Sequence, residues 1–144
     1  MRLQRRDHRR KGMSMIEAVL TTTALLTLCL GTIDLGVAVF RQHALTEAAR
    51  QGARQAIVHG SKATQLGTWT AGNYQTPLRQ FVLPLLPGID PDTVTIQADW
   101  PDGGNDPGQR ARVTVRTSYR PIITLLFGSP SFNLSATSVM PIAH

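Results

Sequence analysis

The sequence predicts an α+β fold, in which a long N-terminal helix packs on a small antiparallel sheet of about three strands. Two observations predict the helix: residues 15–40 are nearly free of charge, and residues 41–59 repeat small apolar side chains at helical spacing. A third observation predicts the sheet. Residues 93–98 and 110–119 alternate between apolar and polar side chains, and residues 132–140 make a third strand.

The chain divides into a basic leader at 1–12, a long helix at 13–59 whose transmembrane part is 15–40, and a small extracytoplasmic α+β domain at 60–144. The leader holds six basic residues and one acidic residue, a net charge of +5, whereas the rest of the chain has a net charge of +1. A basic run can bind nucleic acid. Directly before an apolar segment it is more typical of an orientation signal, because Lys and Arg beside a span stay in the cytoplasm. We therefore expect a cytoplasmic N-terminus and no nucleic-acid partner.

The apolar segment Met15–Phe40 is 26 residues long, or about 39 Å as a helix, against a hydrocarbon core of about 30 Å. The first alternative, a buried helix of a soluble protein, does not explain the basic flank or the scarcity of charge. The second, a cleavable secretory signal, has an apolar region of only roughly 7–15 residues and ends in a small-residue cleavage site. Cys29 lacks the small preceding residue of a lipoprotein signal, so we interpret it as a packing residue. The segment predicts a single-pass membrane protein.

The helix is expected to continue beyond the membrane through Arg41–His59 and to end at Gly60-Ser61. Apolar residues occupy one side of this part, and charged residues face elsewhere. Because this stripe consists mostly of small residues, we expect a partner to approach it closely. Its members are Leu45, Ala48, Ala49, Gly52, Ala56 and Ile57.

The part of the chain after the long helix combines loops, a short helix and strands. Residues 61–75 are polar and rich in Gly and Thr, so we expect a loop. Thr76 is expected to cap a short helix over 78–86. The turn-rich connector 99–109 joins the first two strands into a hairpin. The type of the apolar segment 121–127 is left open.

The junction between leader and span reads RRKGMSMIEAVL, with Gly12 five residues before Glu17. An acid inside a membrane segment is costly, by roughly 2.5–3.5 kcal/mol at a helix centre and by less towards its end. Ser14 and Glu17 stand at capping-box spacing, which offers a purely structural explanation. A helix cap, however, gives no reason for a glycine between the basic residues and the span.

With these residues the sequence resembles type IV pilin precursors. The resemblance implies that a prepilin peptidase, a membrane aspartyl protease, cleaves the chain on the cytoplasmic side after Gly12. Cleavage leaves a new amine on Met13 and makes Glu17 the fifth residue of the mature chain. In a bundle of spanning helices, Glu17 would then supply the counter-charge that the amine of a neighbouring subunit needs in a water-poor setting.

A narrower resemblance is carried by the segments LGTIDLGVAVFRQHALTEAARQGARQAIV and LSATSVMPIAH. Both are similar to TadE-like proteins, which have an acid near the end of the span and an Ala-Ala-Arg-x-Gly-Ala-Arg segment after it. Two positions differ: Ala18 stands where an aromatic residue is usual, and residues 21–23 are threonines where a proline is frequent. The resemblance implies a minor pilin or pseudopilin of the Flp/Tad pilus, used in adhesion and secretion. Its partners would be other pilins, bound through the N-terminal helix, and the prepilin peptidase; its location would be the bacterial cytoplasmic membrane or the pilus.

Two further features of the apolar segment concern helix contacts. Thr27 with Gly31, and Thr32 with Gly36, form pairs of small residues four positions apart, which suit close packing against a neighbouring helix. Asp34 is the second acid of the segment. It either pairs with a polar group of a partner protein or lies at the outer membrane interface, and we favour the interface.

No pattern typical of catalysis occurs in the sequence: we find no nucleophile elbow, phosphate loop or metal-ligand spacing. The acidic connector lacks the spacing and the final glutamate of a calcium loop. We therefore expect a structural protein and no enzyme, with no catalytic residue, metal, cofactor or small-molecule substrate. The alternative function is an uncleaved, single-pass envelope protein whose extracytoplasmic domain binds another molecule. An intact leader on the mature protein would distinguish it.

Overall fold

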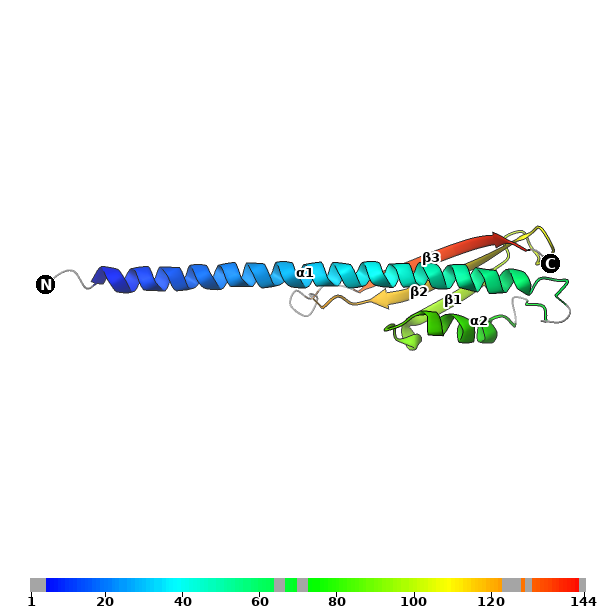
Figure 1. The fold of residues 1–144 in the computed structure, drawn as a ribbon, viewed down its shortest axis with the longest axis horizontal. Coiled ribbons are helices and arrows are strands. Elements are labelled where there is room, and N and C mark those ends of the chain that lie inside the picture. Colours follow the sequence, from blue (N-terminus) through cyan, green and yellow to red (C-terminus); the bar gives the residue numbers. More distant parts are fainter. Residues whose placement is uncertain (1–4, 64–66, 70–72, 123–127, 129–130, 143–144) are drawn as a thin grey trace.

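The computed structural model describes residues 5–63, 67–69, 73–122, 128 and 131–142, and it has the predicted α+β architecture. One long helix projects alone over its first half and lies along a three-stranded sheet over its second half (Figure 1). The elements are α1 (Arg5–Val58), α2 (Gln75–Val82), the 3-10 turns η1 (Leu83–Leu85) and η2 (Pro91–Thr93), β1 (Val94–Asp99), β2 (Arg110–Tyr119) and β3 (Phe132–Pro141).

The long helix α1 is continuous from the leader to the far end of the domain at 60–144, which we call the outer domain after its expected location (Figure 1). It begins at Arg5, earlier than the predicted start at residue 13, and ends at Val58. From Met13 onwards it is long and apolar enough to cross a membrane, and its side chains up to Ile33 are exposed or only partly covered. From Asp34 onwards one side of the helix becomes buried. We call residues 13–33 the bare half of α1 and residues 34–58 the packed half.

The sheet has the order β1-β2-β3, and both strand pairs are antiparallel. The central strand β2 has the predicted bounds, and the bounds of β1 and β3 agree with the prediction to within one residue. Val113 and Val115 of β2 face α1 and are fully buried, whereas Thr114 and Arg116 face outward. The alternation in the sequence reports burial directly, because successive side chains of a strand point to opposite faces.

The small-residue stripe of α1 is covered by the protein's own domain. Ala48 and Ala49 are buried, and Gly52 marks the closest approach of the elements. A Cβ atom at Gly52 would lie 3.1 Å from Cγ1 of Val113 in β2 and 3.3 Å from Cγ2 of Val82 in α2. The close approach that these small residues permit is made by β2 and α2 of the same chain, which cover the stripe in the place of a partner molecule.

The short helix begins earlier than the sequence predicts. It begins at Gln75, directly after Tyr74, and Thr76 lies within its first turn. Its N-cap residue is Tyr74, whose side chain makes no capping hydrogen bond, so the predicted cap at Thr76 is wrong. Its inner side buries Leu78 and Val82, which makes packing beside α1 the main source of its stability.

The loop predicted at 61–75 contributes to the core more than its polar composition suggests. Trp69 is buried and stacks on His59 of the α1 terminus, with ring centroids 4.1 Å apart. Tyr74 is buried as well. The apolar segment 121–127 lies outside the described residues from position 123 onwards, so its type is not assigned.

Gly52 and Gly36 offer a matched pair of substitutions on one helix. We expect Gly52→Leu to destabilise the outer domain by about 1–3 kcal/mol or more, because its side chain would enter a filled core. Gly36→Leu should leave the stability of the domain unchanged, since a Cβ atom there meets nothing within 4 Å. Urea unfolding in detergent, followed by the fluorescence of Trp69 and Trp100, measures both. Equal midpoints for the two variants would contradict the packing described here.

Candidate functional site

The residues of the predicted cleavage and assembly site all lie on α1. Gly12 is inside the helix, and Met13 and Glu17 are exposed, Met13 by 76%. Met13 and Glu17 are four positions apart and therefore share a face of the helix. No side chain among the described residues bonds the Glu17 carboxylate, so it is accessible to another molecule.

The predicted helix-packing residues Thr27, Gly31, Thr32 and Gly36 lie at the outer end of the bare half and just beyond it. The Thr27 and Thr32 hydroxyls donate to the backbone carbonyl oxygens four residues before them, at 2.9 and 2.8 Å. These bonds satisfy the hydroxyls inside the helix, which is how threonine tolerates an apolar surrounding. The outer domain leaves Gly36 uncovered.

Asp34 joins the two halves of α1 to the outer domain. It is 5% exposed, and its Oδ1 accepts a hydrogen bond from the Ile122 backbone N–H at 2.9 Å. The Tyr119 hydroxyl lies 3.2 Å from the same Oδ1 and 3.2 Å from the Asp34 carbonyl oxygen. The sequence suggested that Asp34 either pairs with a partner protein or lies at the membrane interface. Neither interpretation includes these contacts with the outer domain of the same chain. We call this end of the domain, where β2 ends and β3 begins, the junction end.

Arg41 completes the polar contacts of the junction end. Its guanidinium carbon lies 4.9 Å from the centroid of the Tyr119 ring, a cation–π contact, and its Nη2 donates to the Gly88 carbonyl oxygen at 3.4 Å. Burial raises the pKa of Tyr119, and the charge of the Asp34 carboxylate and its hydrogen bond raise it further, while Arg41 opposes them. Tyr119 therefore stays protonated at neutral pH and remains a hydrogen-bond donor.

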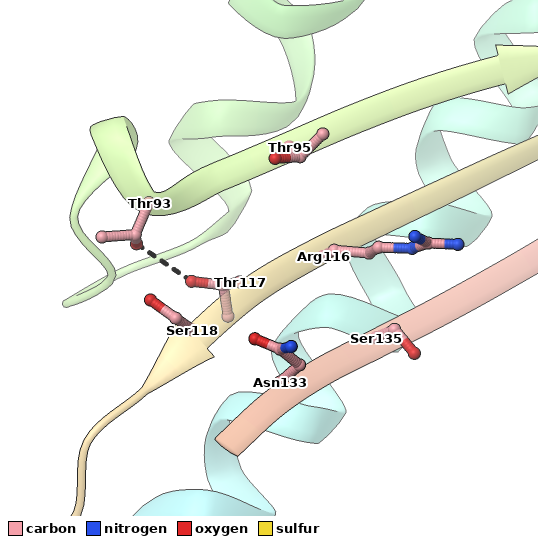
Figure 2. A pocket seen from close by; sticks show the side chains of 7 residues that line it. All are labelled: Thr93, Thr95, Arg116, Thr117, Ser118, Asn133 and Ser135. Carbon is pink, nitrogen blue, oxygen red and sulfur yellow. Dashed lines mark hydrogen bonds between the residues drawn. The ribbon is translucent and has the colours of Figure 1, made fainter. Parts of the chain in front are cut away.

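The outward face of the sheet carries a shallow polar hollow of about 420 Å³ (Figure 2). Strand register places Arg116 of β2 between Thr95 of β1 and Ser135 of β3. At one edge the hydroxyls of Thr93 and Thr117 lie 3.0 Å apart and share a hydrogen bond. The hollow is lined by Thr93, Thr95, Arg116, Thr117, Ser118, Asn133 and Ser135.

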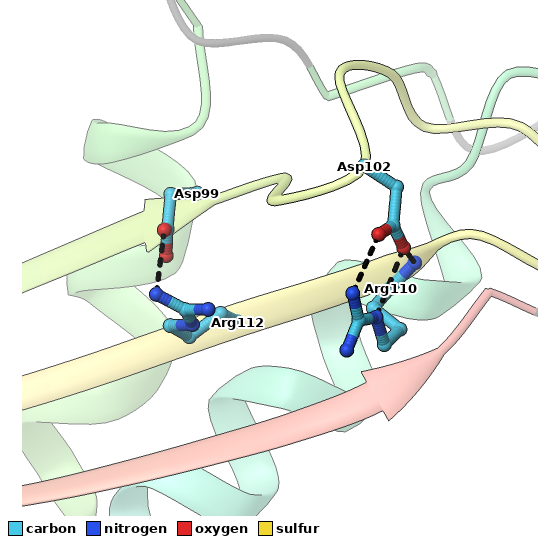
Figure 3. A network of polar contacts seen from close by, with 4 residues as sticks. All are labelled: Asp99, Asp102, Arg110 and Arg112. Carbon is cyan, nitrogen blue, oxygen red and sulfur yellow. Dashed lines mark hydrogen bonds and ion pairs between the residues drawn. The ribbon is translucent and has the colours of Figure 1, made fainter.

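The end of the sheet away from the junction end carries two pairs of oppositely charged residues (Figure 3). Arg110 Nη2 lies 2.7 Å from Asp102 Oδ1, and Arg112 Nη1 lies 3.4 Å from Asp99 Oδ2. Hydrogen bonds from the side chain and backbone of Arg110 lower the pKa of Asp102 to about 2. Asp99 and Asp102 are thus paired with arginines, and Asp106 accepts a hydrogen bond from the Ser61 hydroxyl at 2.8 Å. The described part of the chain contains no cluster of three His, Cys, Asp or Glu side chains that could hold a metal.

Sequence reasoning missed Tyr119 and Ile122 as partners of Asp34. The first could have been found: Tyr119 continues the inward-facing series of β2, so the strand pattern already directs it towards α1. Ile122 acts through its backbone N–H, for which no side-chain signal exists.

The structure thus combines one helix that is bare and apolar over one half with an antiparallel sheet that covers its other half. A family model described as TadE-like protein matches residues 12–54, which include the bare half and most of the packed half of α1. The match confirms the resemblance inferred from the N-terminal motifs. No curated protein and no solved structure matches the chain.

Substitutions at Asp34 test the junction. Asp34→Ala should lower the free energy of unfolding of the outer domain by about 1–3 kcal/mol, because the Ile122 N–H loses its acceptor and Tyr119 loses one of two. Asp34→Asn keeps a side-chain oxygen and should cost less. Chemical denaturation in detergent measures both variants. Equal losses for alanine and asparagine would show that the acceptor is not what matters.

Proposed function

We propose that the chain is a minor pilin-like or pseudopilin-like structural protein of a Flp/Tad-type pilus or a related secretion assembly. The observation that carries the proposal is that the TadE-like match, residues 12–54, lies on a helix whose bare half, residues 13–33, is left uncovered by the described part of the chain. Exposed apolar surface on this scale is a mark of a membrane or protein interface. Lipid and neighbouring pilin helices are the two surroundings that suit it.

The arrangement in the membrane follows from charge. The basic leader stays in the cytoplasm, the bare half crosses the cytoplasmic membrane once, and the domain at 60–144 lies outside. In this orientation the packed half of α1 holds the domain on the axis of the span. The role is structural: the protein positions a domain at a membrane or at a filament and carries out no reaction itself.

The proposed processing step is cleavage between Gly12 and Met13 by a prepilin peptidase. A helix must unwind locally before a protease can cleave a peptide bond inside it, and Gly12 lies inside α1. Glycine lowers helix stability by about 1 kcal/mol relative to alanine, so the helix unwinds most easily there. Gly12 thus matches the cleavage motif and also eases the local unwinding of the helix that cleavage requires.

The proposed role of Glu17 is to pair with the new amine on Met13 of a neighbouring subunit. Alone in lipid, the carboxylate carries a desolvation cost that a positive partner offsets. Because Glu17 is exposed on the bare half and bonds no described side chain of its own chain, it is available for such a pair.

Replacing Gly12 tests the processing step. With a prepilin peptidase coexpressed, the wild-type chain should lose its leader and begin at Met13, whereas Gly12→Leu should remain full-length with membrane insertion intact. The mass of the detergent-extracted protein distinguishes the two products.

Ser14→Ala is the matched control, because it removes a side-chain hydroxyl two residues away and leaves Gly12 in place. Since α1 begins at Arg5, Ser14 lies inside the helix and does not cap it. It should be processed normally. Efficient processing of Gly12→Leu would refute the proposed cleavage position.

Replacing Glu17 tests assembly. Glu17→Ala should insert into the membrane at least as well as the wild type, because an acid leaves the apolar segment, yet it should no longer copurify with the other pilins. Glu47→Ala is the control: Glu47 is an exposed acid of the packed half that accepts a bond from Gln51 at 2.8 Å. If both variants copurify equally with the pilins, Glu17 is not the assembly residue.

The second candidate function is an uncleaved, membrane-anchored protein whose outer domain binds a ligand. The polar hollow around Arg116 favours it, because one guanidinium among hydroxyl and amide groups suits an anionic, hydroxyl-rich ligand (Figure 2). The N-terminal mass separates the candidates, since an intact leader in the presence of the peptidase supports the second.

A further inference from the structure

We propose that the junction end of the outer domain is seated in the headgroup layer of the membrane, so that lipid covers it. The inference rests on the proposed span and goes beyond it, because it assigns a lipid-binding surface to the folded domain. It combines the height of Asp34, the exposed apolar side chains around it and the charges beside them.

The height of the domain above the membrane is fixed by Asp34. The bare half, Met13–Ile33, is about 31 Å long at ~1.5 Å per residue, and a hydrocarbon core is about 30 Å thick. The bare half therefore fills the core, and Asp34 lies at its outer boundary. Because Asp34 bonds Tyr119 and Ile122, the end of β2 lies at the same level. The predicted transmembrane part, 15–40, would place residues 34–40 in hydrocarbon, whereas the junction places them beside the domain.

Exposed apolar side chains gather at this level. Leu35, Val39 and Phe40 are 50–68% exposed on α1, and Ile122 and Phe132 are 51% and 53% exposed on the domain. Phe132 is the strand partner of Tyr119, which fixes its place at the junction end. Phe40 is about 10 Å above Ile33 along the helix axis, and helical side chains tilt towards the N-terminus, here towards the membrane. These side chains thus come within reach of a headgroup layer about 5–7 Å thick.

The charges beside this apolar group suit a lipid surface. Arg120, directly after β2, is exposed, and Arg41 lies half-buried against Tyr119. Arginines at the boundary of an apolar surface attract anionic headgroups. Of the described acids, Asp34 is buried and Glu47 lies two turns beyond Phe40. Asp90 and Asp92 are exposed and directly precede β1, whose first residue, Val94, pairs with Thr117 near the end of β2. The junction end therefore presents apolar side chains and arginines, with two exposed carboxylates at the start of β1. The apolar side chains and the arginines are the groups that a membrane surface binds.

Nitroxide accessibility in lipid vesicles tests the inference on the full-length chain. In a Cys29→Ser background, Phe132→Cys and Val139→Cys carry the label on one strand, at the junction end and seven residues away from it. Both native side chains are about half-exposed, 53% and 46%, so that neither label has to enter the core. In vesicles of phosphatidylethanolamine and phosphatidylglycerol, we expect contact of the label at 132 with a water-soluble nickel chelate to be several-fold lower than at 139. Oxygen contact at 132 should be higher. Phe40→Cys should behave like 132.

Two controls make every outcome decisive. A label on native Cys29 should be shielded from the chelate; exposure there would refute the span itself. Shielding at 29 with equal chelate contact at 132 and 139 would overturn the inference and leave the span standing. Repeating the measurement at falling protein-to-lipid ratio separates lipid from neighbouring protein. Shielding at 132 that persists on dilution supports lipid, and shielding that disappears assigns the surface to another protein chain.

Discussion

The structure depends on the close approach of α1 to the central strand of the sheet. Gly52 and the alanines around it let the helix come within van der Waals contact of Val113, with Val82 of α2 closing the side. Larger residues at these positions would separate the elements, because a filled core has no room to yield. Since α1 is continuous, this contact also fixes the domain relative to the span, and the orientation of one determines that of the other.

The parts of the fold that the sequence predicted well are those in which burial repeats with the backbone period. The two-residue alternation of β2 gave its bounds, and the helical spacing of the alanines gave the packed side of α1. The same stripe could not reveal what covers it. Small residues predict close packing, but they fit a partner molecule and the sheet of the same chain equally well. Only the tertiary structure decides between the two.

The junction was beyond sequence reasoning for a different reason. Asp34 and its partners Tyr119 and Ile122 are 85 and 88 residues apart, and one of the donors is a backbone N–H. An acid in an apolar segment suggests that it has a polar partner but does not identify the residue. The buried aromatic residues of the polar loop escaped for a related reason. Trp69 is held by stacking on His59 and by hydrogen bonds of its backbone with His59 and Asn105, and none of these contacts follows a periodic pattern.

The covering of α1 restricts how the proposed assembly forms. The packed half uses its small-residue side within its own domain, so contacts between spanning helices must use the bare half. The outward face of the sheet is dominated by hydroxyl, amide and guanidinium groups, which are well solvated and give little driving force for burial. The bare half combines apolar area with small residues and an acid available for pairing. Association through the span therefore leaves the outer face of the domain free, whether the protein lies at the base of a filament or within it.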